Sequence, residues 1–598
     1  MAKPNMNTSK AKDFKGTLKK LIKYISNYKI AFIIVFVFAI GSTIFSIVGP
    51  KILGNATTEL FDGLMNKISG TGKINFDAIG KILITTLILY IVSTIFSYVE
   101  GLIMATITNK TSYRLRKEIS EKVNRLPMKY FDKKTNGEIL SIVTNDVDTL
   151  TQSLDQCGTQ IITSIVTVFG ILYMMITINI PMTILSILIL PICLIMTGFV
   201  FKHGQQHFKN NQEYLSKVNG TVEEMYSGHS VVKVFNAEEK MINEFEKYND
   251  KLYESSWKSQ FISGLMPPIM NFVGNLGYVM VALAGGYYVI KGKITVGNIQ
   301  SFIQYNKQFT QPIGQMAQVS NMIQSMIAAA ERIFEFLDEE EEIYNKTNPI
   351  PINSIQGNVE FKNVKFGYDE NKIIINDFSA KIKQGKKIAI VGPTGAGKTT
   401  MVKLLMRFYN VNDGEILIDG ININKFKRKE LRKIFGMVLQ DTWLFNGTIM
   451  ENLRYGKLDA TDDEVIEASK AAYVHHFIQT LPEGYNMELN EETNNISNGQ
   501  KQLLTIARAI LSNPKILILD EATSSVDTRT EILIQKAMDK LMEGRTSFII
   551  AHRLSTIKNA DLILVMKDGD IVETGNHKEL LEKNGFYASL YNSQFEEA

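Results

Sequence analysis

Long uncharged segments constrain the fold of this chain more than any other feature. Five of them lack any acidic or basic side chain, and each reaches the roughly 18 residues that a helix needs to cross a bilayer. They cover residues 30–48, 82–99, 161–178, 181–201 and 261–290. The alternative, long buried helices of a soluble protein, is disfavoured because soluble helices rarely run so far without a charge. The sequence therefore predicts an all-α transmembrane domain.

A sixth, more polar span is predicted at 294–330. Its glutamines recur every three or four residues, so they share one face of a helix: Gln300, Gln304, Gln308, Gln311, Gln315 and Gln318. Lys307 falls close to this face. Lipid does not tolerate such a stripe, so either Gln304, Lys307, Gln308 and Gln311 line a substrate cavity, or the stripe makes hydrogen bonds between helices. Glu100 is either the charge opposite Lys307 or an ordinary residue at a helix end.

Charge sets the expected orientation. Residues 1–29 carry eight lysines and one aspartate, which predicts a cytoplasmic N-terminal segment, and the apolar stretch that follows is too long for a signal peptide. A six-helix domain at 30–335 then has its lysine-rich and arginine-rich segments 104–157 and 202–260 inside. Breaks at 128–137 and 223–239 predict long cytoplasmic helix extensions joined by short crossing helices, with plain solvated loops as the alternative.

Composition excludes other classes of site. The net charge of +4 is small and follows the membrane-facing loops, so it indicates no nucleic-acid surface. The two cysteines, Cys157 and Cys193, imply neither a disulfide framework nor a metal site.

A glycine-rich run indicates what drives the membrane domain. The run GPTGAGKTT follows an apolar strand at 388–391 and precedes a helical stretch at 400–408, which is the context of a phosphate-binding P-loop rather than of a simple glycine turn. We expect ATP to bind there. Lys398 would reach the β- and γ-phosphates, and Thr399 would help to hold Mg²⁺. The predicted loop consists of Gly392, Pro393, Thr394, Gly395, Ala396, Gly397, Lys398, Thr399 and Thr400.

After a linker at 336–356, short strands alternate with helices, which predicts an α/β P-loop nucleotide-binding domain at 357–598. The apolar strand 516–520 ends in Asp520, predicted to hold Mg²⁺ through water, and Glu521, predicted to polarise the attacking water. The pair could instead cap a helix. Gln440 would sense metal and water, and His552 the γ-phosphate.

Tyr368, ahead of the P-loop, offers an aromatic face for the adenine ring, although alone it would more often be an ordinary core or surface tyrosine.

These motifs occur with the run ISNGQKQ at 496–502, which resembles the signature motif of ATP-binding cassette proteins. With six spans before one cassette, the chain resembles a type I exporter half-transporter of the multidrug and lipid A exporter group. The resemblance implies that Tyr368 is the A-loop aromatic, that Gln440 is the Q-loop residue and a metal ligand, and that His552 is the switch histidine. It also implies a D-loop over Ser525–Asp527 and coupling helices near Asp132 and Gly228. The signature residues Ser497, Asn498, Gly499 and Gln500 would act on the ATP of a partner chain.

The signature departs from the family pattern LSGGQ, because Ile496 and Asn498 replace its first and third residues. A side chain at 498 should hinder close approach to phosphate, although asparagine tolerates left-handed torsions. Since the catalytic set of this chain is complete, we predict a heterodimer with a partner that has an intact signature and a weakened Walker B glutamate or switch histidine. The alternative is a homodimer that tolerates Asn498.

The predicted function is ATP-driven export of an amphipathic small molecule or drug by alternating access in a dimer, in a bacterial cytoplasmic membrane. A lipid flippase or peptide exporter of the same architecture stays open. An ATP-gated channel or regulatory membrane subunit would not need the complete hydrolytic set that includes Glu521 and His552.

Overall fold

The computed structural model describes residues 11–342, 355–369, 372–439, 442–489, 495–520, 526–550 and 557–595. The chain forms two compact units. The first, called the helical unit, comprises Met1–Asn124 and Thr135–Glu339. The second, called the nucleotide unit, comprises Glu340–Ala598 together with the short segment Arg125–Lys134.

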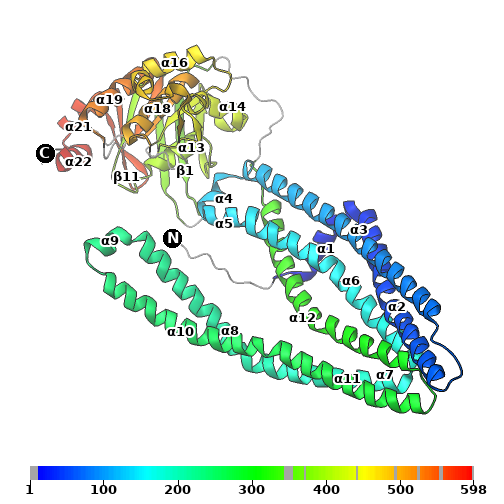
Figure 1. Cartoon of the computed structure of the whole chain (residues 1–598). Helices are drawn as coiled ribbons and strands as arrows, with labels where there is room; N and C mark the ends of the chain where they lie inside the picture. The colour runs from blue at the N-terminus through cyan, green and yellow to red at the C-terminus, as the bar shows by residue number, and fades with distance from the viewer. Residues whose placement is uncertain are drawn as a thin grey trace. The chain divides into compact units, whose positions relative to one another are not determined.

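The helical unit is built from long helices (Figure 1). In chain order they are α1 (Phe14–Ile25), α2 (Lys29–Ile68), α3 (Phe76–Val123), α5 (Asn136–Ser141), α6 (Val147–Ile178), α7 (Ile180–Ile187), α8 (Ile189–Ser227), α9 (His229–Val234), α10 (Glu238–Gly264), α11 (Met266–Ile290) and α12 (Val296–Asp338). The helices α2, α3, α6 and α12 pack on one another, whereas α8 pairs with α10 to make a long arm that α9 closes. The breaks predicted at 128–137 and 223–239 are occupied by short helices, α4 (Met128–Lys133) and α9.

Four helical runs in the described residues are long and apolar enough to cross a membrane: Phe14–Ile68, Phe76–Val123, Asn136–Ile178 and Glu238–Ile290. The predicted span 181–201 is wrong as one continuous helix, because α7 ends at Ile187 and α8 begins at Ile189. Pro191 explains this break, since proline has no N–H to donate to the carbonyl four residues earlier. The count of six spans stays a prediction.

Small and polar residues join α2 to α12. A Cβ atom on Gly297 would lie 1.7 Å from the carbonyl oxygen of Gly54, so these two backbones approach more closely than any side chain allows. Nearby, the Ser301 hydroxyl donates to the Pro50 carbonyl at 2.8 Å, and the buried Tyr305 hydroxyl donates to the Ile47 carbonyl at 2.9 Å. These contacts satisfy polar groups within an otherwise apolar bundle.

The nucleotide unit contains two main sheets. A six-stranded sheet has the order β12-β11-β3-β10-β9-β6, in which only β12 is antiparallel to its neighbour. A four-stranded antiparallel sheet has the order β2-β1-β4-β5. The strands are β1 (Val359–Phe366), β2 (Ile375–Ile382), β3 (Lys387–Val391), β4 (Asp413–Ile418), β5 (Ile421–Asn422), β6 (Phe435–Val438), β9 (Ile516–Asp520), β10 (Thr546–Ile550), β11 (Leu562–Lys567) and β12 (Asp570–Gly575), with a short pair β7 (Gly447–Thr448) and β8 (Glu488–Leu489) apart from both.

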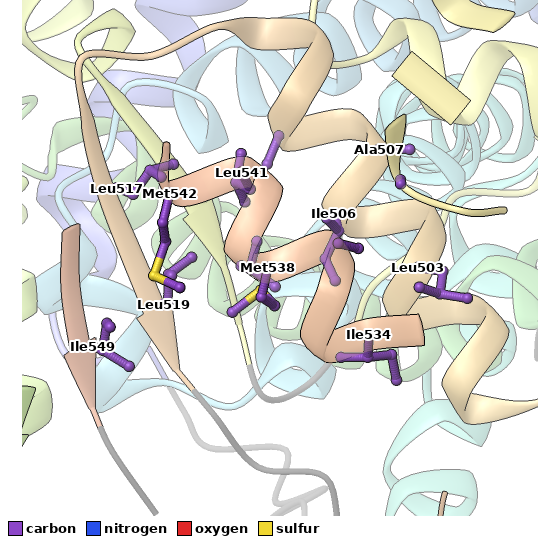
Figure 2. Close-up of a cluster of buried hydrophobic side chains, with 14 of the residues drawn as sticks. Leu503, Ile506, Ala507, Leu517, Leu519, Ile534, Met538, Leu541, Met542 and Ile549 are labelled. Atoms are coloured by element: carbon purple, nitrogen blue, oxygen red, sulfur yellow. The ribbon is translucent and has the colours of Figure 1, made fainter. Parts of the chain in front are cut away.

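Helices cover these sheets: α13 (Lys398–Leu405), α14 (Arg428–Lys433), α15 (Ile449–Arg454), α16 (Asp462–Ala471), α17 (His475–Thr480), α18 (Asn498–Ser512), α19 (Thr528–Met542), α21 (His577–Glu582) and α22 (Phe586–Phe595). One hydrophobic core lies between β9, β10 and the pair α18 and α19, where Leu503 and Ile506 meet Ile534 and Met538 (Figure 2). This packing fixes the N-termini of α18 and α19 relative to each other. The α/β class predicted for this half is confirmed.

Candidate nucleotide site

The P-loop joins β3 to α13, as the sequence predicted, and its glycines are required by the geometry. Gly395 and Gly397 have φ angles of 88° and 99°, a region that favours glycine. A Cβ atom on Gly392 would lie 2.3 Å from the Met566 carbonyl oxygen, because the loop starts against β11. The loop therefore keeps a tight curve, with glycine at the three positions where a side chain would clash or strain the backbone, at the N-terminus of α13, where backbone N–H groups and the helix dipole favour an anion.

Lys398 is oriented by the loop that it belongs to. Its ammonium group donates to the carbonyls of Gly392 at 2.6 Å and Pro393 at 3.0 Å. Burial lowers the pKa of the Lys398 side chain, and the carboxylate of Asp520 partly offsets this effect. The ammonium therefore lies over the anion-binding curve and within electrostatic reach of Asp520, as a phosphate-binding lysine requires.

The other predicted catalytic residues follow strands that end at the same edge of the sheet. The strands β3, β10, β9 and β6 are mutually parallel, so their carboxyl ends lie together. Strand β9 ends at Asp520, β10 ends at Ile550 and β6 ends at Val438. Glu521, His552 and Gln440 come one or two residues after these ends in the sequence, and they lie outside the described residues.

Tyr368 belongs to an aromatic cluster after β1. Its ring meets the edge of the Tyr409 ring at a centroid distance of 5.0 Å and that of Phe366 at 5.1 Å. Its hydroxyl lies 3.3 Å from the hydroxyl of Thr400, in the first turn of α13. Tyr368 is half-buried, so the P-loop helix and two rings hold a partly accessible aromatic side chain beside the phosphate-binding loop.

The signature residues begin helix α18. Ser497 is the N-cap, and it forms a capping box with Gln500 in which each side chain accepts a hydrogen bond from the other's backbone N–H. Gly499 is buried, and a Cβ atom there would lie 2.5 Å from Thr530 Cγ2 in α19. Asp527, predicted in the D-loop, caps α19 by accepting from the Thr530 N–H at 2.9 Å. Thr530 thus connects the signature helix to the D-loop residue.

The tolerance of asparagine for left-handed torsions is not needed at position 498. Asn498 is the first residue of α18, and it is not among the described residues with positive φ. Because the capping box sets helical torsions at this position, asparagine causes no backbone strain. Its side chain is exposed, so the substitution changes only what the N-terminus of α18 presents to a partner.

In the helical unit the glutamine stripe makes at least two contacts between helices. The Thr57 hydroxyl donates to Gln300, and Gln160 donates to Gln315 at 2.6 Å. Gln304 and Gln308 are half-buried, and Lys307 is exposed. The side chain of Gln311 lies outside the description. Glu100 is buried within the helical unit, so its side chain faces other helices.

Sequence reasoning missed the residues around Tyr368. Tyr409 and Lys403 both contact Asp132 of α4, which lies 277 and 271 residues away in the chain. The sequence indicated only that a crossing helix lies near Asp132, and no local pattern predicts its partners.

These features define a class: a polytopic helical membrane protein that carries its own P-loop nucleotide-binding unit. Two family models match the chain, the ABC transporter transmembrane region over residues 32–313 and the ABC transporter domain over residues 375–524. Among curated relatives, a fatty acid ABC transporter ATP-binding/permease protein of Mycobacterium bovis is 44% identical over 98% of this chain and 97% of its own length. An ATP-dependent lipid A-core flippase of Syntrophus aciditrophicus is 35% identical over 88% of this chain and 87% of its own.

The chain belongs to the ABC transporter family, as an exporter half-transporter in which membrane and ATP-binding domains are fused. It is a multi-pass membrane protein that hydrolyses ATP to drive transport. A half-transporter requires a second copy or a second chain, because it supplies one membrane domain and one nucleotide-binding domain.

Proposed function

We propose that the chain exports an amphipathic small molecule, drug or lipid from a bacterial cytoplasmic membrane by alternating access in a dimer. The observation that carries this proposal is that one chain combines the P-loop site with a helical unit whose cavity has both polar and apolar walls. A cavity of about 400 Å³ between α1, α6 and α12 supports the substrate class. Ile161, Ile165, Val319 and Ile323 give it apolar walls, and Ser164, Ser320 and Gln324 supply polar groups.

Among amphipathic substrates, a lipid or fatty acyl compound is favoured by the relatives, since one is named a fatty acid transporter and another a lipid A flippase. A cavity that combines apolar walls with a few hydroxyl and amide groups suits one acyl chain with a polar end. Gln304, Lys307, Gln308 and Gln311 are proposed to extend this pathway, whereas Gln300 and Gln315 serve helix packing.

For nucleotide chemistry, the P-loop from Gly392 to Thr400 is proposed to bind the phosphates. The glycine curve and the inward Lys398 ammonium fit a triphosphate, and Thr399, Gln440 and Asp520 would hold Mg²⁺, because side-chain oxygens are the ligands that it prefers. Bound Mg²⁺ would supply charge neutralisation for phosphoryl transfer. Glu521 orients and polarises the attacking water, His552 contacts the γ-phosphate side, and Tyr368 stacks on the adenine.

The partner is proposed to be a different chain with an intact signature and a degenerate Walker B motif. The exposed Asn498 side chain at the N-terminus of α18 supports this pairing, since it adds bulk where the family pattern has glycine. Apolar side chains at the tip of the long arm also need a cover outside the membrane: Val234 and Phe235 are 74% and 75% exposed. We propose that the partner's nucleotide-binding domain covers them.

Reconstitution into lipid vesicles tests the function. The chain is expressed alone and together with a neighbouring exporter gene product, and ATP hydrolysis and the transfer of fluorescent fatty acyl or lipid probes are measured. ATP hydrolysis and probe transfer that require the second chain support the proposal. Robust, cooperative activity of the chain alone contradicts the heterodimer, and hydrolysis without movement of any amphipathic probe contradicts the substrate class. An ion current opened by ATP would indicate the channel alternative.

A further inference from the structure

We infer that Asp132 of the crossing helix α4 is a positioning residue for the adenine-binding side chain, acting on Tyr368 through Tyr409 and Lys403. The inference rests on the proposed role of Tyr368 in binding the base. All of these residues belong to the nucleotide unit, because the segment Arg125–Lys134 is part of it.

The hydrogen bonds begin at Asp132. Its carboxylate accepts a hydrogen bond from the Tyr409 hydroxyl and forms an ion pair with the Lys403 ammonium at 3.3 Å. Tyr409 is buried, and burial followed by the hydrogen bond to Asp132 raises the pKa of its phenol. The phenol is therefore a fixed donor across the physiological range, and Asp132 is its described acceptor.

Aromatic contacts extend the connection to Tyr368. The Tyr409 and Tyr368 rings are nearly perpendicular, at 87°, in the edge-to-face geometry that aromatic pairs prefer. The Lys403 ammonium lies 5.6 Å from the Tyr368 ring centroid and 5.9 Å from that of Tyr409. The Lys403 ammonium therefore interacts with both tyrosine rings and also forms the ion pair with Asp132. A change at Asp132 alters the hydroxyl of one ring and the cation beside both.

The segment that carries Asp132 is also held at its other end. The Glu342 N–H donates to the Arg125 carbonyl at 2.8 Å, and the Glu342 carboxylate is buried against Arg428 and Arg432. Because the segment is held at Arg125 independently of Tyr409, Asp132 can hold Tyr409 in place rather than follow it. The consequence is functional: occupation of the base site would reach α4 through Tyr409 and Lys403, which lie outside the P-loop residues 392–400.

The test separates base binding from phosphate binding in the full-length, reconstituted transporter. The variants are Asp132→Asn, Tyr409→Phe, Tyr368→Ala and the conservative Asp132→Glu, with Asp463→Asn, an exposed aspartate of α16, as the matched control. ATPase kinetics give KM and kcat for ATP. Inorganic tripolyphosphate, which has no base, serves as a competitor that reports on the P-loop alone.

We expect D132N and Y409F each to raise KM for ATP about 3- to 10-fold, with kcat and the inhibition constant of tripolyphosphate changed less than about twofold. D132E restores KM at least partly, and the double variant is no worse than the worse single variant, because both substitutions break one connection. D463N behaves as wild type.

Other outcomes have distinct meanings. If Y368A raises KM for ATP but D132N and Y409F leave it unchanged, Tyr368 binds the base and the inference about Asp132 is overturned. If Y368A has no effect, the proposed role of Tyr368 fails, and the inference fails with it. If D132N weakens tripolyphosphate and ATP equally, Asp132 supports the general fold of the unit rather than the base site.

Discussion

Glu342 follows α12 in the chain and forms buried ion pairs within the nucleotide unit. Its replacement by glutamine tests how much these ion pairs stabilise the unit. Its side chain is 4% exposed, and it pairs with Arg428 at 2.5 Å and Arg432 at 2.9 Å, whose side chains are 8% and 28% exposed. Burial, followed by the charge of Arg428, lowers the pKa of the neighbouring Arg407 to about 10, while Glu342 opposes this shift. Glu342 is thus the acid that compensates several buried cations.

The expected magnitude follows from this burial. Removing one member of a buried pair costs about 3–5 kcal/mol, and the partial exposure of Arg432 favours the lower end, about 3 kcal/mol. Because each 1.36 kcal/mol is a factor of ten, E342Q should accelerate exchange of the most protected amides of the nucleotide unit by roughly 150-fold. Strand β9, buried along almost its whole length, provides those amides.

Hydrogen exchange followed by mass spectrometry on the full-length protein in nanodiscs measures this effect. Glu340→Gln is the control, since Glu340 is exposed and lies two residues earlier. Exchange in β9 that changes less than about threefold in E342Q would refute the reasoning that the pair is a buried, stabilising connection. Equal acceleration in E340Q would also refute it, because the effect would then reflect net charge alone.

Further substitutions test the remaining assignments. Glu521→Gln should reduce steady-state ATPase by orders of magnitude while fluorescent ATP analogues still bind, and near-wild-type turnover would contradict its role. Gly499→Ala should reduce ATPase about tenfold or more, since its Cβ meets Thr530 at 2.5 Å, with Asn498→Ala as the milder comparison. Gln304→Leu should change substrate preference more than basal ATPase. Asp419→Asn should destabilise the unit at pH 7, and its difference from wild type should shrink as the pH is lowered, as followed by thermal unfolding.

The pH dependence expected for Asp419 comes from its hydrogen bonds. Burial opposes its ionisation, but the side chain of Asn358 and the N–H groups of Asn358, Gly357 and Gln356 donate to its carboxylate, and together they lower the pKa. A carboxyl whose pKa is lower in the folded state stabilises that state above its unfolded pKa. This stabilisation is lost as pH falls through the folded pKa, so wild type and variant should converge in acid.

Sequence predicted the parts of the nucleotide site whose geometry is local. A P-loop needs glycine within a few residues of a strand and a helix, and the observed φ angles of Gly395 and Gly397 follow from that short-range requirement. The strand ending at Asp520 was predicted with the observed bounds, because an apolar run before a carboxylate is also local. The helix break at Leu188 was missed because the apolar pattern continues through it, although Pro191 was a visible signal.

Asn498 shows that a motif letter alone does not give the local backbone conformation. Asparagine tolerates left-handed torsions, but the capping box of Ser497 and Gln500 makes this position the start of a helix, where no such torsions are needed. The glycine that packing requires is Gly499, whose missing side chain lets α18 approach α19. The effect of Asn498 must therefore come from what its side chain presents to a partner, which strengthens the reason to test the signature with the partner present.

Periodicity likewise fixes the face of a helix but not its neighbours. The glutamines at 300, 304, 308 and 315 share one face of α12. Gln300 and Gln315 form hydrogen bonds to other helices, and Gln304 and Gln308 are proposed to line the substrate pathway. Asp132 and Tyr409 meet across 277 residues for the same reason, since only the folded chain brings them together. The residues that would connect ATP hydrolysis to transport make contacts between distant parts of the chain. Substituting them should change the amount of substrate transported per ATP hydrolysed, while the local nucleotide motifs stay intact.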